Sequence, residues 1–247
     1  MALIEVQNFK KSFGEKRIHN GVTFFVRKGE CMGLVGGSGA GKSVILRTLI
    51  GLERPDSGEI RIDDKSIIGL DEIAFTEIRK KVAYAFQGGA LFDSMTVREN
   101  LSYPLQQHTT MTAKQVLDKV KNQLNEFGLL DALDLYPSEL SGGMQKRVGL
   151  ARAMMLDPEI ILYDEPTAGL DPYNTIKIQD LIVRLKEKGV TSILVTHDIP
   201  TALNVCDKIA FLKDKVIAEQ GTIEQLQEQI NNKTEGLINQ FMQGLVV

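Results

Sequence analysis

Several residue types and patterns are scarce in this sequence, and each absence excludes a class of protein. There is no tryptophan, and the only two cysteines, Cys31 and Cys206, lie far apart and outside any CxxC pair. We therefore expect neither a disulfide framework nor a zinc site, but two reduced, partly buried thiols. No stretch reaches the roughly 20 successive apolar residues that span a bilayer, and the opening residues lack the pattern of a signal peptide. The sequence thus predicts a chain that remains in the cytosol.

A large excess of charge of either sign is also missing. The 247 residues include 29 lysines and arginines against 32 aspartates and glutamates, a formal net charge of −3. No overall positive field draws the chain to nucleic acid, so we expect no nucleic-acid partner. Hydrophobic residues make up 43% of the chain, which is enough for a packed globular core.

The order of strand-like and helix-like segments predicts an α/β fold. Two runs rich in β-branched and aromatic residues, 3–9 and 22–26, open the chain and are typical of an antiparallel edge sheet. Short apolar strands then alternate with longer helical stretches, which predicts a mainly parallel sheet covered by helices. The predicted strand and helix pairs are 31–35 with 41–50, 160–163 with 173–188, and 192–195 with 199–205.

The middle of the chain has a different pattern. Between about residues 88 and 157 helical periodicity dominates, as Leu117, Val120, Leu124 and Phe127 illustrate, so we expect a helical insertion in the α/β core. Towards the end, 208–212 and 216–219 read as a strand pair. Thr222 and Gln225 fit a capping box for a terminal helix.

The strongest local motif is a glycine-rich loop at residues 36–43, GGSGAGKS, which fits G-x-x-x-x-G-K-[ST] between a predicted strand and a predicted helix. Its backbone N–H groups can converge on phosphate oxygens, Lys42 can reach the β- and γ-phosphates, and the Ser43 hydroxyl can ligate Mg²⁺. The motif indicates a nucleoside triphosphate site; the alternative is a glycine-rich turn that binds nothing. A dinucleotide-binding GxGxxG is excluded because Lys42 stands where its third glycine would be needed.

A second element follows the predicted strand 160–163. Asp164 and Glu165 lie where that strand ends, which places them at the carboxyl edge of the sheet beside the phosphate loop. Asp164 is expected to hold Mg²⁺, and Glu165 is positioned to polarise an attacking water. The alternative for the pair alone is an exposed acidic turn.

A third motif points to a family. Residues 140–145, LSGGMQ, open a predicted amphipathic helix that bears Lys146, Arg147 and Arg152, a setting typical of anion binding. This segment resembles the signature motif of the ABC ATPases. The further marks of that family occur in its order, namely Phe13, Gln87 after the predicted strand 82–86, the segment 168–171 (AGLD) and His197 after 193–196.

The resemblance implies a single nucleotide-binding domain over 1–247. Its phosphate-loop core and antiparallel β-subdomain would comprise 1–87 and 158–221, a helical subdomain 88–157, and a helical tail 222–247. It implies catalytic roles for Lys42, Gln87, Glu165 and His197, and Mg²⁺ ligands in Ser43, Gln87 and Asp164. It implies ATP contacts from Phe13, Gly36, Gly37, Ser38, Gly39, Ala40, Gly41, Lys42, Ser43, Val44, Ser141, Gly142, Gly143 and Asp171. Taken alone, Phe13 could be a surface aromatic, Gln87 a solvated side chain and His197 structural.

The family also implies a head-to-tail homodimer, because the signature helix lies too far from its own phosphate loop to touch the same nucleotide. Ser141 and Gly143 of each copy would then complete the site of the other, and Asp171 would link the two sites across the interface. The stretch 86–100, FQGGALFDSMTVREN, looks most like the MlaF-type ATPases of the Mla (maintenance of lipid asymmetry) systems. Residues 139–158 and the tail 237–244 support this likeness.

The Mla likeness implies a peripheral ATPase on the cytoplasmic face of the inner membrane that drives phospholipid transport. Its partners would be an MlaE-like permease, a STAS-domain regulator and an Mce-domain protein. Candidates for a groove that receives the permease are Phe92, Asp93, Met95, Glu99 and Tyr103, with ordinary packing as the alternative. Leu237, Ile238, Phe241 and Met242 recur at helical spacing, and a tail helix could dock on a neighbour or pack on its own chain.

Three other functions stay open at this point. An importer ATPase for a small polar solute would carry the same cassette. A non-transport ABC ATPase would normally add tandem cassettes, long helical arms or a basic appendage. A nucleotide switch without turnover conflicts with the presence of both Glu165 and His197.

Overall fold

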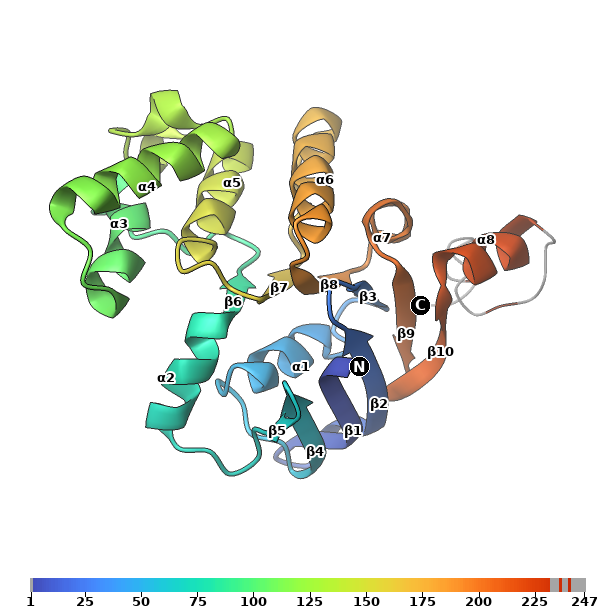
Figure 1. The fold of residues 1–247 in the computed structure, drawn as a ribbon. Helices are drawn as coiled ribbons and strands as arrows, with labels where there is room; N and C mark the ends of the chain where they lie inside the picture. The colour runs from blue at the N-terminus through green and yellow to red at the C-terminus, as the bar shows by residue number, and fades with distance from the viewer. Residues whose placement is uncertain (1, 232–235, 237–239, 241–247) are drawn as a thin grey trace.

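The computed structural model describes residues 2–231, 236 and 240. Figure 1 shows two β-sheets in the lower half of the view and a group of helices above them. The first sheet has four strands in the order β2-β1-β4-β5, paired antiparallel. Their bounds are Ala2–Phe13 (β1), Lys16–Arg27 (β2), Ser57–Ile62 (β4) and Lys65–Ser66 (β5). The predicted N-terminal antiparallel sheet is confirmed, with β4 and β5 added to it.

The second sheet has six strands in the order β10-β9-β3-β8-β7-β6. All but β10 run parallel to their neighbours, which confirms the prediction of a mainly parallel sheet. The bounds are Cys31–Val35 (β3), Val82–Ala85 (β6), Ile160–Asp164 (β7), Thr191–Thr196 (β8), Lys208–Lys213 (β9) and Val216–Thr222 (β10). The three central strands β3, β7 and β8 are buried at every position, as expected for a sheet covered on both faces.

One face of this sheet packs, together with the first sheet, around helix α1 (Lys42–Leu49). Ile45, Leu46 and Leu49 of α1 are almost completely buried, and each such side chain contributes about 1.5–3 kcal/mol of transfer free energy. Helix α2 (Glu72–Lys81) adds Phe75 to this core. The phosphate loop is therefore anchored at its exit by a helix enclosed between two sheets.

The predicted helical insertion is confirmed by helices α3 (Val97–His108), α4 (Ala113–Glu126) and α5 (Gly142–Ala153). Capping boxes start the first two, with Thr96 and Glu99 at α3 and Thr112 and Gln115 at α4. Two 3₁₀ turns, Leu130–Ala132 and Pro137–Glu139, join α4 to α5. Figure 1 shows these helices together above the end of β6.

The other face of the six-stranded sheet is covered by α6 (Pro172–Glu187) and α7 (Ile199–Val205). After β10, α8 (Ile223–Asn231) begins with the predicted capping box, since Thr222 N–H donates to Gln225 Oε1 and Gln225 N–H to Thr222 Oγ1. The tail positions Leu237, Ile238, Phe241 and Met242 lie outside the described residues. Over the part of the chain that is described, no helix is both long and apolar enough to cross a bilayer.

The two cysteines differ from the prediction of partly buried thiols, because both are buried. The start of β3 and the residue after α7 bring Cys31 Sγ to 3.7 Å from Cys206 Sγ. The backbone around them is held by Asp207, whose carboxylate accepts the Cys31 N–H at 2.9 Å and whose N–H donates to Cys31 O at 2.8 Å. This neighbourhood arises from a parallel strand pairing far apart in sequence, which spacing alone cannot indicate.

Candidate nucleotide site

The loop that joins β3 to α1 has a backbone that only glycine accommodates at its last position. Gly41 has a φ of +93°, and a Cβ there would lie 2.4 Å from Ile18 Cγ2 and 2.7 Å from His19 Nε2. The loop thus rests directly on β2. Because Gly41 has no side chain to cap α1, the N–H groups of Lys42 and Ser43 remain available to an anion, whereas the Val44 N–H already donates to Gly41 O at 2.9 Å.

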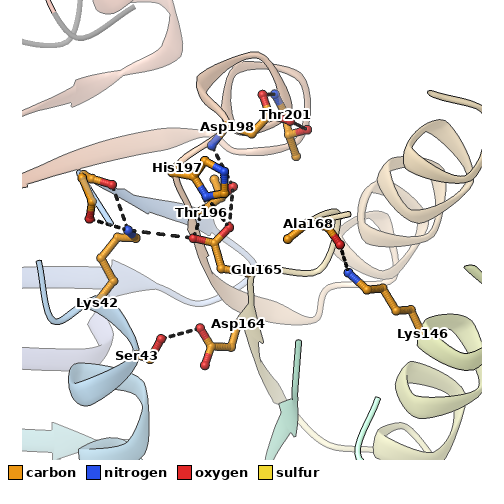
Figure 2. Close-up of polar contacts among 12 residues, drawn as sticks. Lys42, Ser43, Lys146, Asp164, Glu165, Ala168, Thr196, His197, Asp198 and Thr201 are labelled. Carbon is orange, nitrogen blue, oxygen red and sulfur yellow. Dashed lines mark hydrogen bonds and ion pairs between the residues drawn. The ribbon is translucent and has the colours of Figure 1, made fainter. Parts of the chain in front are cut away.

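Lys42 lies across this loop (Figure 2). Its Nζ donates to the carbonyl oxygens of Gly36 at 2.8 Å and Gly37 at 3.0 Å, and lies 3.9 Å from Glu165 Oε1. Burial lowers the pKa of Lys42, and the negative charges of Glu165 and Asp164 oppose that shift. The ammonium group is therefore held by carbonyls that a phosphate oxygen can replace.

Asp164, the last residue of β7, is buried next to the loop. Its Oδ1 accepts a hydrogen bond from Ser43 Oγ at 2.6 Å, and its Oδ2 accepts one from Tyr84 Oη at 2.7 Å. Burial, and then the hydrogen bond and charge of Asp164, raise the pKa of Tyr84 well above its ordinary value, so the hydroxyl keeps its proton. The sequence analysis did not single out Tyr84. The available signal was a hydroxyl-bearing side chain inside a short, otherwise apolar strand that pairs with β7.

Glu165 has a φ of +50°, an uncommon conformation for a residue with a side chain. Its N–H donates to Val195 O at 2.9 Å, which holds it at the end of β8. The carboxylate contacts His197 Nδ1 at 3.0 Å and accepts from Thr196 Oγ1 at 3.4 Å. The Glu165 side chain is 14% exposed and that of His197 59% exposed. Thr196 is a second contact that sequence reasoning missed.

The signature segment begins α5, with Ser141 as its N-cap, accepting from the Met144 N–H at 3.3 Å. Gly143 packs tightly on α6, because a Cβ there would lie 2.4 Å from Asn174. Ser141 itself is exposed.

Two basic residues of this helix have partners within the chain. Lys146 donates to Ala168 O, and Arg152 donates to Ala90 O at 2.7 Å and Gly89 O at 3.3 Å. Burial lowers the pKa of both side chains. They join α5 to neighbouring segments, and anion binding at the start of the helix stays a prediction.

Three further predicted residues lie elsewhere. Phe13 ends β1 and is 45% exposed, with Lys11 Nζ 4.7 Å from its ring centroid. Gln87 is exposed in the turn after β6. Asp171 caps α6 by accepting the Asn174 N–H at 3.0 Å, and this hydrogen bond lowers the pKa of Asp171. Within the described residues, the hydrogen bonds that join the loop, Asp164, Glu165 and His197 do not include Gln87, Ser141 or Asp171.

The oxygen atoms next to the loop are suitable ligands for a hard cation. Ser43 Oγ and Asp164 Oδ1 are both oxygens, and Mg²⁺ is typically held by one or two protein oxygens, waters and substrate phosphates. No group of three or more histidine, cysteine or acidic side chains that could hold a metal occurs among the described residues. The residues present therefore fit Mg²⁺ bound with a nucleotide rather than a metal bound by protein alone.

The parallel sheet carries a glycine-rich loop with a lysine across it. The serine after that lysine is hydrogen-bonded to the carboxylate that ends β7. Together these features define a phosphate-loop nucleoside triphosphatase. Comparison with known proteins narrows this class. The ABC transporter family model matches residues 19–168. The chain belongs to the ABC transporter ATPases, and it binds and hydrolyses ATP as that family does.

Individual relatives extend the match over nearly the whole chain. The probable ribonucleotide transport ATP-binding protein mkl of Mycobacterium leprae is 41% identical over 98% of this chain and 69% of that protein. The intermembrane phospholipid transport system ATP-binding protein MlaF of Haemophilus influenzae is 38% identical over 91% of this chain and 87% of that protein. The chain thus spans about two thirds of the mycobacterial relative.

The fold is that of solved ATP-binding cassettes. A dimeric post-hydrolysis structure of the cassette MJ0796, bound to ADP and Pi, superimposes with a TM-score of 0.82 at 32% identity. The match covers 89% of this chain and 98% of that one. The predicted α/β ABC ATPase fold is confirmed.

Proposed function

We propose that this chain is the ATPase subunit of a bacterial transporter that moves phospholipid between membranes of the cell envelope. The observations that support this choice of cargo are the likeness of residues 86–100 to the MlaF-type ATPases and the alignment with MlaF, which extends over 91% of this chain and 87% of that protein. The L-cystine import ATP-binding protein TcyN of Bacillus subtilis aligns over the same shares of the two chains at 40% identity, which makes a polar-solute importer the second candidate. We place the subunit on the cytoplasmic face of the inner membrane, as a peripheral protein.

In the proposed hydrolysis, the chain binds ATP through the loop 36–44 and stacks the adenine on the exposed ring of Phe13. Lys42 exchanges its carbonyl partners for phosphate oxygens. Glu165 polarises the attacking water, and His197, 3.0 Å from the Glu165 carboxylate, holds the two in line. The Glu165 carboxylate is 14% exposed and 3.9 Å from Lys42 Nζ, while the His197 side chain is 59% exposed, so both side chains are accessible at the loop.

Ser43, Asp164 and Gln87 are the residues we propose to hold Mg²⁺. When bound, the ion would neutralise charge on the phosphates as the bond to the leaving group breaks. Ser43 and Asp164 are already in contact through oxygen atoms at 2.6 Å, while Gln87 follows β6 in an exposed turn. In this proposal Ser43 and Asp164 form a fixed pair of ligands, and Gln87 must move toward the ion to bind it.

The signature residues would serve a second copy of the chain. Ser141 caps α5 with an exposed hydroxyl and takes no part in the hydrogen bonds of its own described phosphate site. We propose that two copies form a head-to-tail homodimer in which Ser141, Gly142 and Gly143 of one contact ATP on the other, and Asp171 links the two sites. The dimeric state of the related MJ0796 cassette supports this arrangement.

Replacing Glu165 with glutamine tests the catalytic assignment. The amide keeps the size of the side chain and loses the basicity, so we expect ATP turnover to fall by about 10²-fold or more while ATP binding persists. Phosphate release and nucleotide binding are measured in parallel. Glu159→Gln is the matched control, since Glu159 lies at the other end of β7 beside Lys81. Wild-type turnover in Glu165→Gln would remove Glu165 from the chemistry.

We propose that a helix of the permease binds in a groove of about 520 Å³. This groove lies between the six-stranded sheet and the helical unit, by which we mean the inserted helices α3, α4 and α5. Phe92 and Tyr103 line it, with ring centroids 5.2 Å apart, and Arg152 lies over Phe92. Met95 and Glu99 line an adjoining hollow. The Glu99 carboxylate also accepts the Thr96 N–H at 2.8 Å, so the capping of α3 accounts for part of its role.

The cargo is tested by identifying the partners. Glu165→Gln protein carrying a tag would be expressed in its own source, and membranes would be solubilised gently and analysed by mass spectrometry. An MlaE-like permease with an Mce-domain protein, a STAS-domain protein and phospholipid supports the proposal. A permease bound to a receptor for a soluble solute contradicts phospholipid as cargo and favours the polar-solute importer, while the ATPase family remains.

A further inference from the structure

Tyr84 lies in the middle of β6, at the edge of the six-stranded sheet and next to β7. Parallel register pairs Tyr84 with Leu162, two residues before Asp164. The half-buried tyrosine therefore reaches along the neighbouring strand to its carboxyl end. There its hydroxyl donates to Asp164 Oδ2 at 2.7 Å.

The two oxygens of Asp164 consequently have separate partners. Oδ1 faces Ser43 Oγ at 2.6 Å, on the side of the phosphate loop (Figure 2), and Oδ2 is occupied by the tyrosine. A carboxylate can rotate about its terminal torsion with little resistance unless a second contact fixes it. The Tyr84 hydrogen bond is such a contact, and it leaves Oδ1 as the oxygen turned toward Ser43.

The aromatic ring of Tyr84 is part of the groove described above. Its ring centroid lies 4.3 Å from that of Phe86, and both side chains line the groove. A tyrosine has only two side-chain torsions, so its hydroxyl cannot move independently of its ring. The same side chain therefore touches both the groove and the buried carboxylate.

We infer that Tyr84 is a positioning residue that orients Asp164 for the metal ion, and that it connects the wall of the groove to the metal site. The inference rests on the proposed role of Asp164 as a metal ligand. Groups that orient metal ligands typically change metal affinity by 10–100-fold when removed. Displacing the ring from the groove side would pull on the same hydrogen bond.

The test removes one oxygen atom with Tyr84→Phe in the Glu165→Gln background, where ATP is bound and not consumed. Binding of a fluorescent ATP analogue is titrated with Mg²⁺, and separately measured in EDTA. We expect the Mg²⁺ concentration for half-maximal metal-dependent binding to rise about tenfold. Affinity in EDTA should stay unchanged, since the loop and Lys42 are intact. Tyr136→Phe, which removes the hydroxyl of an exposed tyrosine directly before the 3₁₀ turn Pro137–Glu139, is the matched control.

The link to the groove is tested with Phe86→Leu, which removes the ring stacked on Tyr84 and keeps the hydroxyl. We expect the half-maximal Mg²⁺ concentration to rise less than in Tyr84→Phe, and the affinity in EDTA to stay unchanged. An unchanged Mg²⁺ dependence in Tyr84→Phe overturns the positioning role, and an unchanged dependence in Phe86→Leu overturns the link. If Mg²⁺ has no effect on the parent Glu165→Gln protein, the proposed metal site itself is wrong, and this outcome is distinct from either.

Discussion

His19 is a buried imidazole directly beneath the phosphate loop. Its Nε2–H donates to the carbonyl of Gly41 at 3.1 Å, and its ring centroid lies 5.2 Å from that of Phe9. Its Nδ1 has no hydrogen-bond partner among the residues that the structure describes. Burial lowers the pKa of His19, and the hydrogen bond to Gly41 only partly opposes the shift. The fold thus holds the neutral ring.

The stability of the protein should depend on pH through His19. Its folded pKa lies below the unfolded value of about 6.5, so the unfolded chain takes up a proton first as pH falls. The contribution of His19 is present above that unfolded value and is lost as pH falls toward the folded one. Between pH 7.5 and 5.5, the wild type should lose more unfolding free energy than His19→Gln, with an upper bound of about 1.4 kcal/mol set by the unfolded pKa.

Urea unfolding of both proteins at each pH measures this difference. His108→Gln is the control, because His108 is exposed at the end of α3. Equal pH profiles for the wild type and His19→Gln would mean that the buried ring does not resist protonation.

Among the individual residues of the site, those that lie within sequence motifs could be predicted from the sequence. Lys42, Ser43, Asp164 and Glu165 were expected together. The structure places Ser43 Oγ 2.6 Å from Asp164 and Lys42 Nζ 3.9 Å from Glu165, because the strand ends and the loop share one edge of the sheet. Tyr84 and His19 were not anticipated, since their contacts depend on which strands become neighbours. The chemical roles of the motif residues stay predictions.

Two glycines set how closely the helical unit approaches the sheet. A Cβ on Gly149, in the middle of α5, would lie 2.6 Å from the Cα of Gly89, in the loop after β6. A Cβ on Gly89 would lie 2.9 Å from Gln145 O, and its φ is +74°. Arg152 secures the same contact through the carbonyls of Gly89 and Ala90. The backbone of α5 is in direct contact with the backbone of the loop after β6. A side chain added there can be accommodated only if the helix or the loop moves as a whole.

Gly149→Ala should therefore destabilise the protein by about 1–3 kcal/mol, as overpacking does. The melting temperature should fall by roughly 2–4 °C for each kcal/mol. Gly88→Ala is the control, because a Cβ at Gly88 meets nothing within 4 Å, and its effect should stay within about 0.5 kcal/mol. Calorimetry of both variants decides the matter, and equal melting temperatures would contradict the close packing.

Elements with strong patterns were predicted and elements with weak ones were not. The apolar strands β3, β7 and β8 and the periodic helix α4 follow from the sequence. Helix α2 buries only Phe75 and offers little periodicity, and β5 has two residues, so both escaped notice. The strand order could not be obtained from pattern, because β3 lies between two strands distant from it in sequence.

The groups that the proposed dimer would bring to one ATP lie in two different parts of a single chain. The loop, Asp164 and Glu165 lie at one edge of the sheet, while Ser141 starts a helix of the separate helical unit. Because of this separation, one ATP can contact both the phosphate loop and Ser141 only if two chains form a dimer. It could not be derived from one chain's sequence without the family resemblance.

Sedimentation of the Glu165→Gln protein with Mg²⁺ and labelled ATP tests the central claim most directly. The account predicts a species of two chains with two ATP molecules, which Ser141→Arg in the same background converts to single chains that still bind ATP. A single chain that binds ATP equally well with and without the Ser141 change would contradict a site shared between two copies.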